Sequence, residues 1–63
     1  MPVIILEGTK LTKNQKEKLV KELTKVAADI MEKPQEVFSV LLKENELDNI
    51  GAGGKLLSDI QNQ

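Results

Sequence analysis

The spacing of apolar residues along the chain changes from that of a strand to that of a helix near residue 12. Residues 3–6 are all apolar, which gives a strand two apolar faces and is typical of strands covered on both sides. From residue 13 to about residue 33, apolar side chains instead recur every three or four positions: Leu19, Leu23, Val26, Ala27, Ile30 and Met31. We therefore predict a strand over residues 3–6 and an amphipathic helix over residues 13–33.

Local signals set both ends of this helix. Thr12 and Gln15 have the spacing of a capping box, in which each side chain accepts a hydrogen bond from the backbone N–H of the other residue. Pro34 follows the last apolar positions, and a proline pushes the residue before it out of the helical region. The helix should therefore begin directly after Thr12 and end before Pro34.

Branched and aromatic side chains return over residues 37–43, which predicts a second strand. Alternation would place Phe38, Val40 and Leu42 on one face and Val37, Ser39, Leu41 and Lys43 on the other. A strand, a helix and a strand within about 40 residues form a βαβ unit with parallel strands and a right-handed crossover. One helix leaves one face of such a sheet uncovered, so we expect that face to be an interface with another subunit.

The last third of the chain has the composition of turns. The fragment Gly54-Lys55 invites comparison with a phosphate-binding loop, but that motif requires Ser or Thr at position 56 and Gly at position 49, where this chain has Leu56 and Asn49. We interpret residues 51–54 as a flexible hairpin or a close approach of two backbones. Residues 56–60 should form a short apolar segment that packs on a neighbour, and residues 61–63 should fray.

Composition narrows the class of protein. A chain of 63 residues makes one small domain, residues 1–63, that is marginally stable alone, and without Cys or His it has neither disulfides nor a zinc site to support it. Self-association is the support that remains. A net charge of -1 and a single aromatic residue argue against a nucleic-acid partner. The chain has no long apolar stretch and no targeting segment, so we expect no membrane partner and a cytoplasmic location.

Pro2 is the residue whose chemistry stands out. If Met1 is removed, Pro2 becomes the N-terminus and carries a secondary amine, which can act as a base or attack a carbonyl. The alternative is structural, because a proline can open an edge strand without loss of a sheet hydrogen bond.

Several fragments in order resemble the 4-oxalocrotonate tautomerase family. They are Pro2, Leu6-Glu7-Gly8, Gln15-Lys16-Glu17, Pro34, Glu44 and Ile50-Gly51-Ala52-Gly53-Gly54, and they span nearly the whole chain. The resemblance implies an α+β fold in which a βαβ subunit with a C-terminal hairpin dimerises into a four-stranded sheet, and three dimers form a hexamer. It also implies a tautomerase that needs no cofactor and uses Pro2 as the catalytic base on a small unsaturated 2-hydroxy or 2-keto acid.

The chain departs from the family at the substrate-binding positions. The chain contains no arginine, whereas the family's diacid isomerases hold their substrate with two. At the place of the first arginine this chain has Thr9-Lys10-Leu11, and at the place of the second it has Ser39. The family's aromatic residue that forms a wall of the pocket is replaced by Ile50. Lys10 is a candidate replacement cation, and Lys43 is a second candidate on the face of Ser39. The alternative for each is a solvated surface lysine.

A rival hypothesis from another class is a non-catalytic oligomeric protein that keeps the fold and binds a small anion or a partner. It gains weight if Met1 is retained, because a proline nitrogen in a peptide bond is not a base. A third hypothesis, such as dehalogenation, hydration or decarboxylation in the same pocket, ranks low because the chain has no His, Tyr or Arg to assist it.

Overall fold

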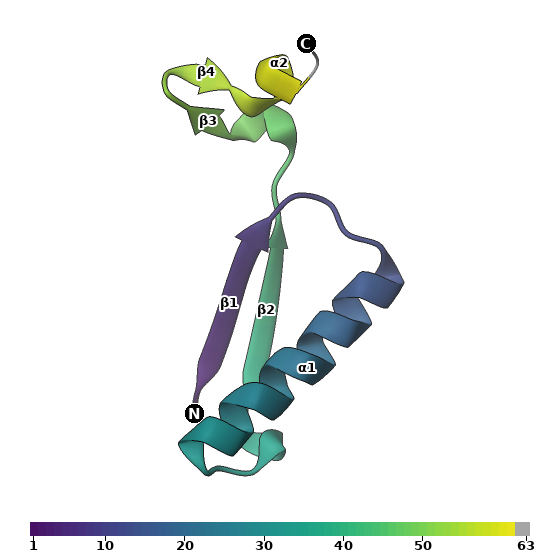
Figure 1. Ribbon diagram of the computed structural model, residues 1–63, viewed down its shortest axis with the longest axis vertical. Coiled ribbons are helices and arrows are strands. Elements are labelled where there is room, and N and C mark those ends of the chain that lie inside the picture. Colours follow the sequence, from purple (N-terminus) through teal and green to yellow (C-terminus); the bar gives the residue numbers. More distant parts are fainter. Residues whose placement is uncertain (62–63) are drawn as a thin grey trace.

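A βαβ unit followed by a small hairpin and a short helix makes up the fold (Figure 1). The computed structural model describes residues 1–61, so the expected fraying of Asn62 and Gln63 lies outside the described residues. In chain order the elements are β1 (Val3–Gly8), α1 (Lys13–Met31), the 3-10 helix η1 (Gln35–Val37), β2 (Ser39–Glu44), the 3-10 helix η2 (Leu47–Asn49), β3 (Gly51–Ala52), β4 (Lys55–Leu56) and α2 (Leu57–Gln61).

Strands β1 and β2 pair in parallel, from Val3 opposite Ser39 to Gly8 opposite Glu44. The backbone N–H of Ser39 also donates to the carbonyl of Pro2 at 3.1 Å, which extends the ladder by one bond beyond β1. The antiparallel pair β3–β4 forms the C-terminal hairpin. The predicted α+β class, with parallel strands, a helical connection and a hairpin, is therefore confirmed.

The capping box predicted at Thr12 and Gln15 is present, with both of its hydrogen bonds formed. At the other end α1 stops at Met31, two residues earlier than predicted, because Glu32 adopts a left-handed conformation with φ 56° and ψ 48°. Backbone N–H groups of Glu32 and Lys33 both donate to the carbonyl of Ala28, which closes the helix.

Three of the four predicted strand bounds were wrong: β1 ends two residues later than predicted, and β2 begins two residues later and ends one residue later, at Glu44. β1 continues to Gly8 because Glu7 and Gly8 have partners in β2. β2 begins at Ser39 rather than residue 37, because Gln35–Val37 form a 3-10 turn in which the N–H of Phe38 donates to the carbonyl of Gln35. In that turn the backbone N–H of Val37 donates to the carbonyl of Pro34, so Val37 does not pair with β1.

The two faces of the sheet have different surroundings. Ile4, Leu6, Val40 and Leu42 are half-buried on the face that α1 covers. On the opposite face Val3, Ile5 and Leu41 are each more than half exposed. The sequence-based prediction that one face of the sheet is uncovered is therefore confirmed, and the open face is the one with Val3, Ile5 and Leu41.

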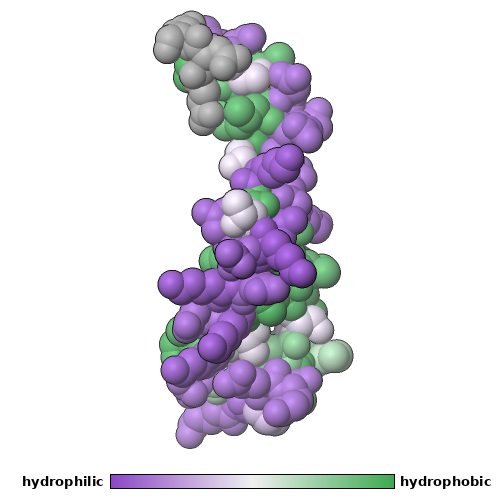
Figure 2. Space-filling view, turned by 90° about the vertical axis from the view of Figure 1, so that its right-hand side faces the viewer, coloured by the Kyte–Doolittle hydropathy of each residue, from purple (hydrophilic) through white to green (hydrophobic). Residues whose placement is uncertain are grey.

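The chain has an elongated shape, with extents of 44 × 24 × 15 Å. Its radius of gyration is 15.1 Å, whereas a compact domain of this length would have about 11 Å. Residues 47–61 form an arm that projects from the βαβ unit beyond the ends of β1 and β2 (Figure 1). Within residues 1–61, Ala28 is the one buried apolar side chain. The other apolar residues are at least partly exposed, and Figure 2 shows apolar surface on both the arm and the βαβ unit.

Candidate active site

Pro2 lies in a surface hollow at the amino end of β1. The hollow is lined by Met1, Pro2, Met31, Lys33 and Val37. Pro2 itself is half-buried, and its carbonyl is held by the N–H of Ser39. The hollow therefore combines apolar walls with one cationic side chain next to the proline.

Three elements bring these residues together. Met31 ends α1, Lys33 follows the left-handed turn at Glu32, and Val37 ends η1. Because Pro34 is extended, with φ -68° and ψ 147°, the chain turns away from the helix axis and returns to the sheet at Ser39, opposite Val3. Residues of the connection from α1 to β2 therefore lie beside the start of β1.

Met1 decides what the proline nitrogen can do. While Met1 is attached, that nitrogen is part of a peptide bond and has no usable lone pair. The Met1 side chain lines the same hollow and is 90% exposed. Removal of Met1 would both create the secondary amine and vacate space beside it.

Of the other candidates, Ser39 lies closest to Pro2 in the fold. It pairs with Val3 in the first register position of the sheet, on the open face. Lys43 lies on the same face, as expected, but pairs with Glu7 four residues further along. Within one protomer Lys43 is therefore at the far end of the sheet from Pro2.

Lys10 and Ile50 also lie away from Pro2 within one chain. Lys10 lines a second hollow, beyond the carboxyl ends of the strands, together with Thr9, Glu44, Asn45, Glu46 and Leu47. The six residue steps from Pro2 to Gly8 separate this hollow from Pro2 by about 20 Å. Ile50 follows η2 at the base of the arm and is half-buried.

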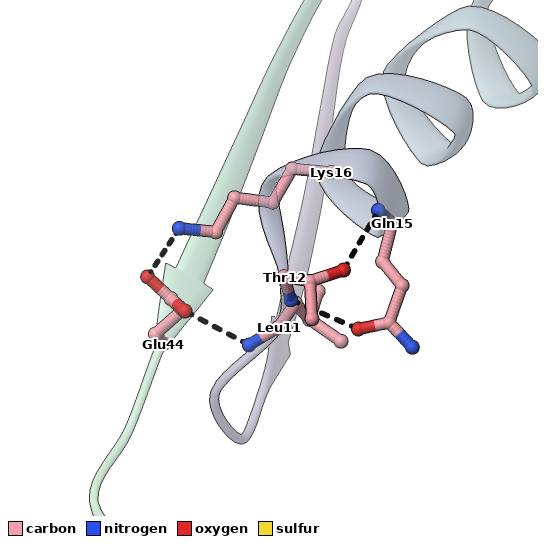
Figure 3. Close-up of polar contacts among 5 residues, drawn as sticks. All are labelled: Leu11, Thr12, Gln15, Lys16 and Glu44. Carbon is pink, nitrogen blue, oxygen red and sulfur yellow. Dashed lines mark hydrogen bonds and ion pairs between the residues drawn. The ribbon is translucent and has the colours of Figure 1, made fainter.

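Glu44 organises this far end (Figure 3). One carboxylate oxygen, Oε2, accepts from the backbone N–H of Leu11 at 2.9 Å, and the other, Oε1, forms an ion pair with Lys16 Nζ at 2.8 Å. The hydrogen bond from Lys16, the bond from Leu11 and the nearby charge of Lys10 hold the pKa of Glu44 below its ordinary value. Glu44, at the end of β2, therefore holds the loop that contains Lys10 in place against this strand.

Residues 2–60 match the family model described as tautomerase enzyme. This chain belongs to the tautomerase family.

Solved structures agree with this tautomerase assignment. DmpI from Archaeoglobus fulgidus is 40% identical, with a TM-score of 0.86, and the match covers 92% of this chain and 100% of that one. A 4-oxalocrotonate tautomerase homologue is 33% identical with a TM-score of 0.86, covering 94% and 95% of the two chains. TomN, a homologue from the tomaymycin biosynthetic pathway, matches in fold at a TM-score of 0.93 with 19% identity, over 98% of this chain and 97% of its own.

The comparison with curated proteins gave no match. The family match and the two closer structures place the protein among tautomerase-type isomerases, and they confirm the family resemblance seen in the sequence.

Three residues of the tautomerase's Pro2 hollow were not predicted from the sequence as site residues: Met31, Lys33 and Val37. The apolar spacing places Met31 on the packed face of the predicted helix, and the branched side chains place Val37 in the predicted second strand. The same pattern places Lys33 at the end of the predicted helix and gives it no role in a site. Pro34 is the sequence signal that could have identified them. The helix ends just before Pro34, so its last residues lie near the start of the second strand. Because the two strands are parallel, Pro2 at the start of the first strand lies at the same edge of the sheet.

Proposed function

We propose that this tautomerase moves a proton within a small unsaturated 2-hydroxy or 2-keto acid, with the amine of Pro2 as the general base after removal of Met1. The observation that carries the proposal is the position of Pro2 in a hollow with apolar walls formed by Met31 and Val37. Apolar surroundings disfavour a charged amine and bring its pKa toward neutrality, where a base is most effective.

The reaction needs one group that accepts and returns a proton. The Pro2 nitrogen takes the proton from the enol hydroxyl, and the electrons of the O–H bond form the carbonyl. The carbon–carbon double bond shifts, and the distal carbon takes a proton back from the prolinium. No oxidant, metal or cofactor enters this balance.

Lysines take the place of the missing arginines in this proposal. An ammonium is a strongly hydrated point charge, whereas a guanidinium grips a carboxylate with two parallel hydrogen bonds. Lys10 and the neutral Ser39 should therefore hold a dicarboxylate poorly. We expect a relative preference for enols with one carboxylate, and Ile50 and Lys43 are proposed to contribute an apolar wall and a further cation.

Assembly would bring these groups together. Lys10, Lys43 and Ile50 lie at the opposite end of the protomer from Pro2. A two-fold axis perpendicular to the strands sets the amino end of one sheet beside the carboxyl end of the other. We propose dimers with a four-stranded sheet, assembled into a hexamer, in which each Pro2 hollow is completed by neighbouring chains.

The test compares the Met1-free protein with Pro2→Ala and with a variant that carries one extra residue before Pro2. Both should keep the fold, and we expect each to lose about 10²–10⁴-fold in kcat/KM because the general base is weakened or lost. Steady-state assays on phenylenolpyruvate, with one carboxylate, and 2-hydroxymuconate, with two, give the rates. Unchanged rates in both variants would rule out Pro2 as the base.

A further inference from the structure

Lys33 is the cationic side chain that lines the Pro2 hollow. The chain has nine lysines and no arginine, and the other eight lie outside this hollow. Within residues 1–61, no carboxylate forms an ion pair with Lys33, since the one ion pair there joins Lys16 and Glu44. Its ammonium is thus available to an anion placed next to Pro2.

The backbone of Lys33 is held on both sides. Its N–H donates to the carbonyl of Ala28 at 3.1 Å, and Ala28 is the buried residue of α1. On one side of Lys33, Glu32 has a left-handed backbone conformation that turns the chain. On the other side, the ring of Pro34 fixes the φ angle of Pro34. The side chain is exposed, and its point of attachment is fixed relative to the hollow.

We propose that Lys33 binds the carboxylate of the substrate beside Pro2 and so selects enol and keto acids over uncharged enols. This inference rests on the proposed function of Pro2. An ammonium next to the hollow is a natural partner for a carboxylate, and a charge-assisted hydrogen bond between them is stronger than a neutral one. It also assigns a cation to the Pro2 end of the protomer, which Lys10 and Lys43 of the same chain do not reach.

A positive charge in this position has a second effect, on the base itself. A cation near an amine disfavours protonation of that amine and lowers its pKa. The other charged groups on the flanking elements are Asp29 and Glu32 near the end of α1 and Glu36 in η1, and none of them lines the hollow. Removal of the Lys33 charge should therefore raise the pKa of the Pro2 amine.

The experiment uses Met1-free protein and three variants: Lys33→Gln, Lys33→Arg and the control Lys25→Gln. Lys25 is an exposed lysine of α1 that lines none of the hollows described above. The probes are phenylenolpyruvate and its methyl ester, which lacks the negative charge. We expect Lys33→Gln to raise KM for the acid about tenfold and to leave KM for the ester within about twofold. Lys33→Arg should retain most of the binding.

Titration of ¹⁵N-labelled Pro2 by NMR provides a readout that a purely structural role would not produce. We expect the pKa of its amine to rise in Lys33→Gln and to stay at the wild-type value in Lys25→Gln. The inference is overturned if Lys33→Gln behaves like Lys25→Gln, or if it raises KM equally for the acid and the ester. If Pro2→Ala retains full activity, the proposed base fails instead, so the two failures are distinguishable.

Discussion

At the scale of single residues, Glu32 has an unfavourable backbone conformation for its side chain. Within residues 1–61 it is the one non-glycine residue with positive φ. A left-handed conformation costs a residue with a Cβ about 1–2 kcal/mol, and a glycine avoids that cost. Glu32 also places a negative charge at the carboxyl end of α1, where the helix dipole favours a positive one.

We predict that Glu32→Gly raises the free energy of unfolding by about 1 kcal/mol. Glu32→Gln is the matched control, because it removes the charge but keeps the Cβ and should give a smaller gain. Thermal unfolding at equal protein concentration measures both. A destabilised Glu32→Gly protein would show that the turn is held by contacts of the Glu32 side chain.

At the scale of elements, Glu44 connects three of them: the end of β2, the loop after β1 and the first turn of α1. Its pKa is lowered in the folded protein, chiefly by Lys16. The ionised form is thus favoured by folding, and the contribution is fully present above the ordinary pKa of 4.5 and is lost as the pH falls below it.

We predict that the stability difference between wild type and Glu44→Gln is largest at neutral pH and shrinks below about pH 4.5. Glu36→Gln is the control, since Glu36 lies in η1 and makes no ion pair within residues 1–61. Denaturant unfolding at several pH values gives the comparison. A difference that does not change with pH would mean that the Glu44 carboxylate contributes through its shape rather than its charge.

How far the sequence predicts these elements depends on whether the signal is local. The helix start at Thr12 was predictable because both capping partners lie within four residues. The start of β2 was not, because Val37 suits a strand by type and the ladder nevertheless begins at Ser39, where β1 supplies its first partner. The ion pair between Lys16 and Glu44 and the approach of Lys33 to Pro2 join residues far apart in sequence, and no local pattern specifies them.

At the scale of the whole molecule, one protomer leaves large apolar side chains exposed. The open sheet face presents Val3, Ile5 and Leu41, and the flank of α1 presents Val26 and Ile30, the latter 77% exposed. The arm of residues 47–61 has few contacts with the βαβ unit of its own chain. Within residues 1–61 the core has one buried side chain, and burial of the exposed surface by other copies would supply the stability that this core lacks.

We predict that Ile5→Lys disrupts the assembly and unfolds the chain, because it places a charge on the open sheet face. Lys25→Glu changes a charge on α1 without touching that face and should leave the assembly intact. Sedimentation velocity and far-UV circular dichroism at micromolar concentration report mass and folding together. A folded monomer for either the wild type or Ile5→Lys would contradict the prediction.

Within residues 1–61 the core of a single chain is one buried side chain, Ala28, and this affects how the amount of active enzyme depends on the rate of protein synthesis. When folding requires partners, the rate of appearance of native protein is of higher than first order in chain concentration. Dilute chains would spend longer unfolded, open to proteases, while concentrated chains would become protected. Activity in a cell would then rise more steeply than the number of chains made, so that a modest change in expression could act almost as a threshold.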